Sequence, residues 1–337
     1  MPASSTVRQP ESQSAYDTLL AYVQDELNQT NALILKNLEN RVVIIPQLAG
    51  HILSAGGKRV RPLLTLATTR LCNGNFQRSI PLAASIEFIH TATLLHDDII
   101  DESSVRRGKP SANAIWGNSA SVLVGDFLFG RSFQLMVADG HLDVLRVLSN
   151  VCSIIIEGEI LQLTASYDFD QAEAHYYDII RAKTGQLFSA GCEVGAAVSD
   201  ASLEQRQAMA DYGMYVGMAF QCVDDLLDYF TDEETMGKRP GDDFREGKIT
   251  LPVLLAYKAA SVSEQALWRD WFNSDDQSDE TLAAIRQELE KHNIQAQVEQ
   301  IAMDFVHKAQ ACLDHFPNSP LRQAFVDFAE FCVKRSF

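Results

Sequence analysis

Apolar residues recur every three or four positions along much of this chain of 337 residues, and this periodicity favours packed helices over sheets. The clearest case lies between residues 203 and 230, where one stripe contains Met209, Tyr212, Val216, Phe220, Val223 and Leu227. Such spacing places side chains on one face of an α-helix. Ser202 and Gln205 precede the stripe as a capping-box pair. Sustained apolar–polar alternation, the usual strand signal, is nearly absent. We therefore expect an all-α fold.

The other helices follow from the same periodicity and from the residues that begin and end helices. We expect them at 16–40, 62–73, 81–101, 119–139 and 142–163, then from a cap at Asp170 to Val198. Residues 262–337 should form three more helices, with breaks at 273–278 and 317–320. No linker or low-complexity segment divides the sequence. We expect a disordered tail over residues 1–14 and one helical-bundle domain over 15–337.

The charge and composition exclude several classes of protein. The net charge of −17 argues against nucleic acid as a partner, because phosphate backbones require basic surfaces. The chain has no run of 18 apolar residues, so no transmembrane segment is expected. The first residues are polar and resemble neither a secretory signal nor a transit peptide. Six scattered cysteines, without metal-ligand spacing, are typical of buried thiols in a reducing cytoplasm.

Two acidic clusters repeat the same pattern on apolar helices. Residues 95–101 read LHDDIID and residues 222–228 read CVDDLLD. Positions i and i+4 lie on one helical face, so Asp97 neighbours Asp101 and Asp224 neighbours Asp228. A single cluster is often a solvated acidic surface. Two clusters with apolar flanks favour a metal site, because Mg²⁺ prefers carboxylate oxygens together with substrate phosphates and water.

Glycine-flanked basic clusters accompany the acidic ones. GGKRVRP at 56–62 places three cations where a loop enters a helix, a geometry suited to anions. RRGK at 106–109 follows the first acidic cluster, while Lys238 and Lys248 follow the second. One such cluster alone would be an ordinary surface loop. The ordered alternation of acids and bases suits a diphosphate substrate that metal ions hold on one side and Lys or Arg on the other.

These segments, together with AKTGQLF at 182–188 and GKRPGDDFREGKITLP at 237–252, resemble the trans-isoprenyl diphosphate synthases, in the order found in that family. The resemblance is greatest to the long-chain bacterial members that make octaprenyl, solanesyl or decaprenyl diphosphate. It covers residues 56–252. It implies an isoprenoid synthase bundle around a central cavity, with the two acidic clusters facing each other across it. It also implies three magnesium ions, a homodimer, and repeated addition of isopentenyl diphosphate to an allylic diphosphate. Farnesyl or geranylgeranyl diphosphate is the expected primer, and decaprenyl diphosphate for a ubiquinone side chain is the expected product.

The resemblance also implies roles for individual residues. Metal ligands would be Asp97, Asp101, Asp224 and Asp228, and the catalytic set would be Asp97, Asp98, Asp101, Asp224, Asp225 and Lys183. The allylic diphosphate would contact Arg106, Lys183, Thr184, Gln221, Lys238 and Lys248. Isopentenyl diphosphate would contact Lys58, Arg61, His90 and Arg107. Without the resemblance, His90 would be read as a core histidine, and Thr184 and Gln221 as locally bonded polar groups. His96 is expected to be structural.

The residues before Asp97 bear on product length. The side chains of Thr93, Ala92 and Ile89 would form the bottom of the cavity, beneath the growing chain. Small side chains at positions 92 and 93 therefore predict a long product. Three other readings remain open: a terpene cyclase or head-to-head synthase, a non-catalytic subunit of an active partner, and a structural helical bundle. Consumption of isopentenyl diphosphate by the purified chain alone would distinguish a polyprenyl diphosphate synthase from these three alternatives. Peripheral membrane contact during product release stays possible, although no basic amphipathic helix marks an anchor.

Overall fold

The fold, taken from a computed structural model, is described for residues 14–54, 57–231, 240–274, 277–334. Its elements in the first half are α1 (Ala15–Ala21), α2 (Gln24–Leu38), α3 (Ile44–Ser54), α4 (Val60–Leu71), α5 (Phe76–Ile100), β1 (Val105–Arg106), β2 (Lys109–Pro110), α6 (Ala112–Trp116), α7 (Asn118–Asp139) and α8 (Leu142–Ala165). The second half contains α9 (Phe169–Ile180), the π-helical turn η1 (Arg181–Gly185), α10 (Gln186–Ala197), α11 (Leu203–Phe230), α13 (Asp242–Arg245), α14 (Leu251–Ala259), α15 (Val262–Asn273), α16 (Asp279–Lys291), α17 (Ile294–Cys312), the 3₁₀ turn η2 (Leu313–His315) and α18 (Pro320–Lys334).

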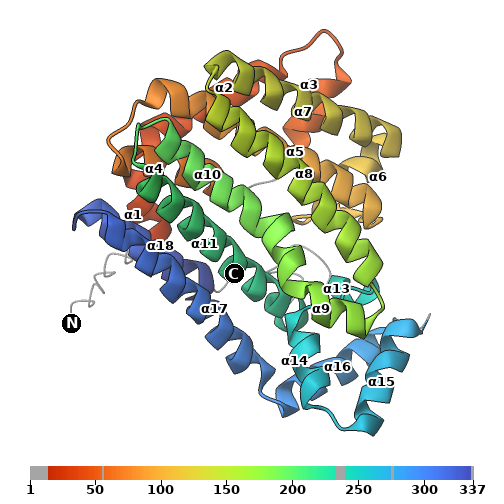
Figure 1. The fold of residues 1–337 in the computed structure, drawn as a ribbon. Coiled ribbons are helices and arrows are strands. Elements are labelled where there is room, and N and C mark those ends of the chain that lie inside the picture. The colour runs from red at the N-terminus through yellow and green to blue at the C-terminus, as the bar shows by residue number, and fades with distance from the viewer. Residues whose placement is uncertain (1–13, 55–56, 232–239, 275–276, 335–337) are drawn as a thin grey trace, which may run out of the picture.

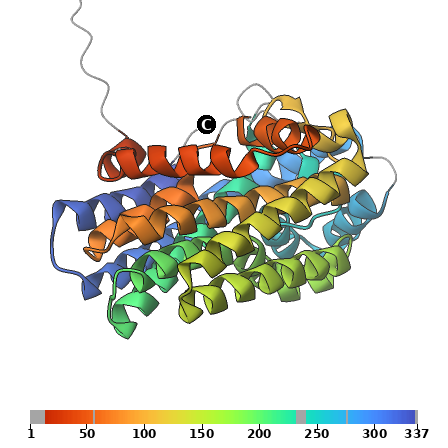
Figure 2. The ribbon, with the colours of Figure 1, turned by 90° about the horizontal axis from the view of Figure 1, so that it is seen from above.

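Helices α10 and α11 run side by side through the middle of the molecule (Figure 1). Helices α17 and α18 cover them on one side, while α5, α7 and α8 lie on the other. Seen from above, the long helices lie roughly parallel to one another (Figure 2). The shorter helices α14–α16 close one end of the bundle. The expected all-α architecture is therefore confirmed, and the short antiparallel pair β1–β2 is a local hairpin directly after the first acidic cluster.

Glycines allow the central helices to approach closely. A Cβ on Gly213 of α11 would lie 2.4 Å from the carbonyl oxygen of Phe188 on α10. A Cβ on Gly195 of α10 would lie 2.4 Å from the carbonyl oxygen of Thr65 on α4. Both contacts are with backbone atoms, which cannot move aside cheaply. The three helices thus form a tightly packed unit that supports one wall of the cavity described below.

Several predicted helix boundaries are confirmed. Ser202 and Gln205 form the expected capping box of α11, and Gly140 ends α7 in the left-handed conformation. Helix α4 begins at Val60, with Pro62 in its first turn. The hydroxyl of Tyr212, in the apolar stripe, donates to the carbonyl of Phe325 on α18 at 2.7 Å.

Other boundaries differ from the expectation, for local reasons. The helix expected over 16–40 is two helices, because the chain leaves the helical conformation at Val23. Asn75 caps α5, so Pro81 lies inside that helix and does not begin it. Asp168 caps α9 in place of Asp170, since its side chain accepts from the amides of Asp170 and Gln171. From residue 262 onward the described residues form four α-helices where three were expected, because Asn293 adopts a left-handed conformation between α16 and α17.

Helix α7 is, among the described residues, the one helix long and apolar enough to cross a membrane by length and composition. It packs along α5 in the bundle and contains Asp126 and Arg131. Its outer face carries exposed apolar side chains, a point taken up below. The expected tail over residues 1–14 lies outside the described residues except for Ser14, which caps α1.

Candidate active site

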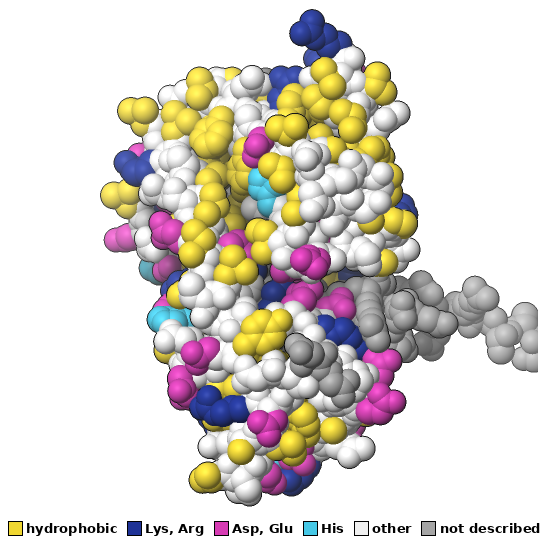
Figure 3. Space-filling model, turned by 90° about the vertical axis from the view of Figure 1, so that its right-hand side faces the viewer, with side chains coloured by type: hydrophobic (Ala, Val, Ile, Leu, Met, Phe, Trp, Pro, Cys, Tyr) yellow, Lys and Arg dark blue, Asp and Glu magenta, His cyan; other side chains and the backbone are white. Residues whose placement is uncertain are grey.

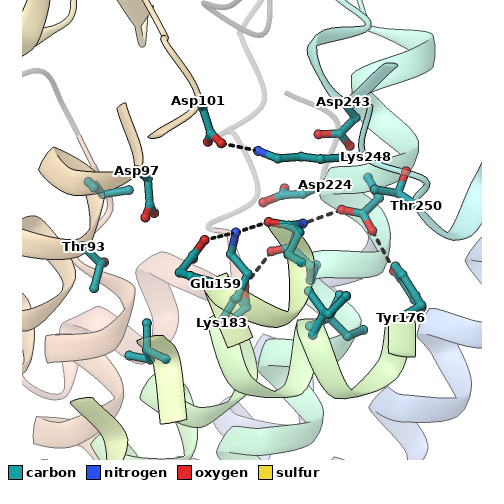
Figure 4. A pocket seen from close by; sticks show the side chains of 18 of the residues that line it. Thr93, Asp97, Asp101, Glu159, Tyr176, Lys183, Asp224, Asp243, Lys248 and Thr250 are labelled. Carbon is teal, nitrogen blue, oxygen red and sulfur yellow. Dashed lines mark hydrogen bonds and ion pairs between the residues drawn. The ribbon is translucent and has the colours of Figure 1, made fainter. Parts of the chain in front are cut away.

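A cavity of about 390 Å³ opens between the C-terminal end of α5, helices α8 and α9, the turn η1 and helix α11. Each acidic cluster contributes to one wall. Asp97 and Asp101 lie on one side, and Asp224 lies opposite them, near Asp243 (Figure 4). The two clusters therefore face each other, as the sequence predicted, although they are more than a hundred residues apart. The C-terminal end of α5 also favours a cation by its dipole.

Crowding of negative charge has a visible consequence at Asp97. Burial raises the pKa of its carboxyl to about 7, with Glu159 and Asp101 adding to the rise and Lys183 opposing it. Glu159 comes from α8 and points into the same cavity (Figure 4). A carboxyl held this close to other carboxylates gains from a bound cation, which removes the repulsion.

Two lysines bridge the acidic walls. The Lys183 ammonium lies 2.7 Å from a carboxylate oxygen of Glu159 and also donates to the amide oxygen of Gln162. The Lys248 ammonium lies 2.9 Å from Asp101 and 2.6 Å from Glu246. Although burial lowers the pKa of Lys248, Asp101 and Glu246 hold it above the usual range. Both lysines are therefore cations aimed into the cavity.

A chain of hydrogen bonds holds the second acidic cluster in place. The Tyr176 hydroxyl donates to Asp225 at 2.7 Å, and the Gln221 amide donates to the other oxygen of Asp225 at 2.7 Å. The Thr184 hydroxyl donates to Gln221 at 2.7 Å. Burial raises the pKa of Asp225 to about 6, while Tyr176 and Gln221 work against the rise. Asp225 is thus an anchored carboxylate, and both Asp225 and its neighbour Asp224 line the cavity.

The turn η1 explains why Lys183 and Thr184 both reach the cavity. Single π-turns inside α-helices occur often at functional sites, because they shift the register of the side chains. Gly158 on α8 allows this turn to approach. A Cβ there would lie 2.5 Å from the Cβ of Ala182 and 3.3 Å from the Cγ of Lys183. The contact brings α8 beside η1, within reach of the Lys183–Glu159 ion pair.

A second cavity of about 250 Å³ adjoins the first and contains the GGKRVRP cations. Lys58, Arg61, His90 and Arg107 all line it, and the last three also line the larger cavity. Burial lowers the pKa of Arg61 to about 10, so it stays charged at neutral pH. Burial and the nearby arginines hold the pKa of His90 well below its usual range, so this ring is neutral. Because Arg61 can only donate, Nε2 of His90 accepts its hydrogen bond at 3.1 Å, and the ring proton is on Nδ1.

Other predicted site residues lie behind the cavity walls. Asp98 is buried and pairs with Arg106 at 2.6 Å, so it orients an arginine that does line the cavity. Asp228 is fully buried and accepts from the Asp243 amide at 3.1 Å. It does not line the cavity, which differs from its expected role as a metal ligand. Lys238 lies outside the described residues.

The three residues of α5 assigned to product length lie in three different surroundings. Thr93 lines the cavity, one turn before Asp97. Ile89, one further turn back, packs against Ile155 of α8 and other apolar residues in the core below. Ala92 is buried in a different cluster on the α7 side, because position i−5 is rotated away from the face of Asp97. Ala92 therefore does not line the cavity wall, contrary to the expectation.

The sequence analysis did not identify two of the lining residues, Glu159 and Tyr176. Helical spacing does carry a signal for Glu159, since it shares one face of α8 with Ile155 and Gln162, which also line the cavity. Tyr176 could not be assigned in this way, because the π-turn changes the register between it and Lys183. His96 does not line the cavity, and its Nε2 lies 3.2 Å from the carbonyl oxygen of Val122 on α7.

The residues present fit magnesium when the ion also has non-protein ligands. Among the described residues, no group of three or more His, Cys, Asp or Glu side chains could hold a metal ion alone. Mg²⁺ typically takes one or two carboxylates and completes its octahedron with phosphate oxygens and water. Oxygen donors on facing walls, and the raised pKa of Asp97, match that requirement. Asp97, Asp101 and Asp224 are the cavity-lining carboxylates that would hold such ions.

Comparison of the sequence with known proteins identifies the family of this chain. A sequence model described as polyprenyl synthetase matches residues 42–289. The octaprenyl diphosphate synthase of Escherichia coli (strain K12) is 41% identical over 317 residues, covering 90% of this chain and 94% of that protein. The all-trans-nonaprenyl-diphosphate synthase of Rhodobacter capsulatus is 37% identical over 327 residues, covering 94% of this chain and 97% of that protein.

Solved structures of similar proteins share the whole fold. A polyprenyl synthase from Caulobacter crescentus CB15, complexed with calcium and isoprenyl diphosphate, superposes with a TM-score of 0.93 at 42% identity, covering 97% of this chain and 99% of that one. A decaprenyl diphosphate synthase from Rhodobacter capsulatus gives 0.89 at 44% identity, with 95% and 98% of the two chains covered.

Binding of Mg²⁺ is predicted to strengthen as pH rises from 6 to 8. Only the ionised Asp97 can ligate a metal, and its pKa in the metal-free protein is about 7. Because this folded-state pKa lies above the unfolded value, Asp97 contributes less to the free energy of unfolding as pH rises from about 4 to 7. Bound Mg²⁺ offsets that loss. Thermal unfolding with and without Mg²⁺ should show a larger rise in Tm at pH 8 than at pH 6.

Asp97→Asn is the matched control for this titration. It removes the ionisable group with little change in shape, so the rise in Tm caused by Mg²⁺ should be small at both pH values. An equal rise in the wild-type protein at pH 6 and pH 8 would contradict the assignment.

Proposed function

Because the chain belongs to the polyprenyl synthetase family and is a long-chain trans-prenyltransferase, we propose that it adds isopentenyl diphosphate repeatedly to an allylic diphosphate. The observation that carries this proposal is the pair of adjoining cavities. The larger is lined by facing carboxylates together with Lys and Arg side chains, and the smaller by Lys58 and arginines. Two diphosphates could thus bind side by side, one through bridging metal ions and one through direct contact with cations.

The allylic diphosphate fits the larger cavity. Asp97, Asp101 and Asp224 would hold magnesium ions, three in the complete site, which supply positive charge that stabilises the leaving diphosphate. Lys183, Lys248 and Arg106 would donate to its oxygens from the remaining sides, with Thr184 and Gln221 between them. Lys238, which lies outside the described residues, is also expected to contact this diphosphate. Asp225 and Asp228 would support the wall through the hydrogen bonds described above.

Isopentenyl diphosphate fits the smaller cavity, where Lys58, Arg61, His90 and Arg107 would bind its phosphates. Arg61, His90 and Arg107 line both cavities, so the two substrates would lie next to each other. The apolar side chains of Ile155, Ile179 and Ile180 exclude water from the larger cavity, which protects a delocalised allylic cation. The C–O bond of the allylic ester breaks, the double bond of isopentenyl diphosphate attacks, and the departing diphosphate takes the released proton.

Loss of one acidic wall should abolish turnover. With farnesyl diphosphate, labelled isopentenyl diphosphate and Mg²⁺, Asp224→Ala is expected to lower kcat by a factor of about 100 or more. Asp304→Ala on α17 is the control, since that exposed carboxylate lines neither cavity. Incorporation of label into extractable lipid measures the rate. The proposal is wrong if the wild-type protein consumes no isopentenyl diphosphate, or if Asp224→Ala keeps a kcat within about threefold of it.

For the product we propose a chain in the octaprenyl to decaprenyl range, with decaprenyl diphosphate for a ubiquinone side chain as the specific expectation. The support is overall similarity to a decaprenyl diphosphate synthase and the small side chain of Thr93 below the acidic wall. The growing chain would pass Thr93 and enter the apolar region that Ile89 shares with Ile155. Ala92, on the α7 side of the helix, would influence length indirectly.

Aromatic rings at these positions should shorten the product. Thr93→Phe places a ring directly in the cavity and is expected to give farnesyl or geranylgeranyl products. Ala92→Phe should also shorten the chain, but less, because it must first displace the packing between α5 and α7. Leu35→Phe, at an exposed position on α2, is the control. Chromatography of the dephosphorylated products measures length, and an unchanged length for Thr93→Phe would refute the tunnel placement.

We propose that the enzyme is a homodimer that uses the outer faces of α7 and α8. Exposed apolar side chains there are Val122, Leu123, Phe133, Val137, Ile156, Ile160 and Leu163. Figure 3 shows apolar side chains gathered over the upper part of one face, at the level where α5–α8 lie. A patch of this kind marks an interaction surface in a water-soluble fold. The apolar character of α7 then reflects contact with a second copy of the chain.

Charges in this patch should dissociate the dimer. Leu123 and Val137 are 67% and 65% exposed, and they lie four turns apart on the same face of α7. The double variant Leu123→Glu/Val137→Glu should sediment as a monomer, whereas Leu203→Glu at the start of α11 should not change the mass. A monomeric wild-type protein, or a double variant that stays dimeric, would contradict the proposed interface.

We place the enzyme in the cytoplasm, where isopentenyl diphosphate is its soluble partner. Its product is too apolar to remain in water, so peripheral contact with a membrane would accept the finished chain.

A further inference from the structure

The smaller cavity has a wall that comes from the last described helix. Phe328, Phe331 and Cys332 of α18 line it opposite the α4 entry loop and α5. Its cationic lining includes Lys58, Arg61 and Arg107. Its one carboxylate, Glu87, already pairs with Arg59. The cavity is therefore electropositive overall, and two of its walls are aromatic.

Lys58 differs from the other cations of this cavity in how it is held. Arg61 is buried, bonds to His90 and lies 4.5 Å from the ring centre of Phe188. Lys58 is exposed and, within the described part of the chain, has no carboxylate at ion-pair distance. A free lysine side chain has several rotatable bonds, so fixing its ammonium costs entropy unless neighbours hold it.

Two aromatic rings take the place of a carboxylate. The Lys58 ammonium lies 5.1 Å from the ring centre of Phe331 on α18 and 5.9 Å from that of Tyr16 on α1. The Tyr16 hydroxyl also donates to the Lys58 carbonyl at 2.5 Å, which fixes the backbone at the same residue. Helices α1 and α18 pack against each other, so the two rings come from adjoining helices.

An aromatic cradle has an advantage over an ion pair at an anion site. A carboxylate would neutralise Lys58 and compete with an incoming phosphate, whereas ring faces attract the ammonium and leave its charge available. The stabilisation that such a contact provides is modest. One cation–π interaction of this kind changes an equilibrium by about twofold to fivefold.

We propose that Phe331 and Tyr16 are positioning residues that hold Lys58 in the smaller cavity, and that they set affinity for the homoallylic diphosphate without affecting the allylic one. This inference rests on the proposed function, because it takes the smaller cavity as the isopentenyl diphosphate site. Neither ring lines the larger cavity. The effect is therefore expected on one substrate only.

Steady-state kinetics with each substrate varied in turn provides the test. Phe331→Leu should raise the KM for isopentenyl diphosphate by about twofold to fivefold, with kcat and the KM for farnesyl diphosphate unchanged. Phe331→Tyr keeps a ring face and should restore the wild-type KM. Tyr16→Leu, from the opposite side of the cradle, should give the same selective rise and serves as the second variant if Phe331→Leu fails to fold.

Two further variants separate positioning from general packing. Phe325→Leu removes a buried ring from the same helix, outside both cavities, and should lower Tm without changing the KM for isopentenyl diphosphate. In a Lys58→Gln background, Phe331→Leu should have no further effect, because it acts through the ammonium.

The inference is overturned if Phe331→Leu leaves the KM for isopentenyl diphosphate unchanged, raises both KM values equally, or is not rescued by Phe331→Tyr. A full additional effect in the Lys58→Gln background would also overturn it. These outcomes require a wild-type protein that turns over isopentenyl diphosphate. Failure of the wild-type enzyme to do so is the separate outcome that refutes the proposed function.

Discussion

Repulsion between carboxylates on opposite walls of one cavity is the constraint on which the rest of the site depends. Asp97 and Asp101 approach from α5, Asp224 from α11 and Glu159 from α8, all beside an apolar interior. Such an arrangement is unfavourable without compensating positive charge. Lys183 and Lys248 supply part of it through ion pairs with Glu159 and Asp101. Burial raises the pKa of Asp97 in this site, and the nearby Glu159 and Asp101 add to the rise.

The packing of the bundle serves to keep these charges in place. Glycines let α10 approach both α11 and α4, and Gly158 lets η1 approach α8. The side chains on these helices are consequently fixed by backbone contacts on the sides away from the cavity. Rigid walls matter here, because repelling carboxylates on mobile elements would move apart and no longer face a common ligand. Polar bonds from Tyr176 and Gln221 to Asp225 then fix the orientation of one wall in detail.

Helical periodicity was enough to predict the fold class and the pairing of Asp97 with Asp101, because both depend on local spacing. The facing of the two acidic clusters came from the motif resemblance, since no local pattern shows which distant helices meet. Positions that depend on an irregular backbone do not follow from helical spacing. The π-turn η1 shifts Lys183 relative to Tyr176, and the Asp243 amide at the start of α13 donates to Asp228. Asp228 looked equivalent to Asp101 in sequence, yet it is buried against that amide and does not line the cavity.

The two adjoining cavities differ in how they can bind the same chemical group. In the larger one, carboxylates face each other across the space, so metal ions would be needed to hold a diphosphate between them. In the smaller one, Glu87 is taken up by Arg59, and the remaining cations can meet a diphosphate directly. Under the proposed function, this difference assigns each substrate to one cavity. The diphosphate that must leave binds where metal charge can stabilise it. The diphosphate that must stay on the product binds where only side chains hold it. Aromatic support of Lys58 and Arg61 fits this division, because rings hold these cations without neutralising them.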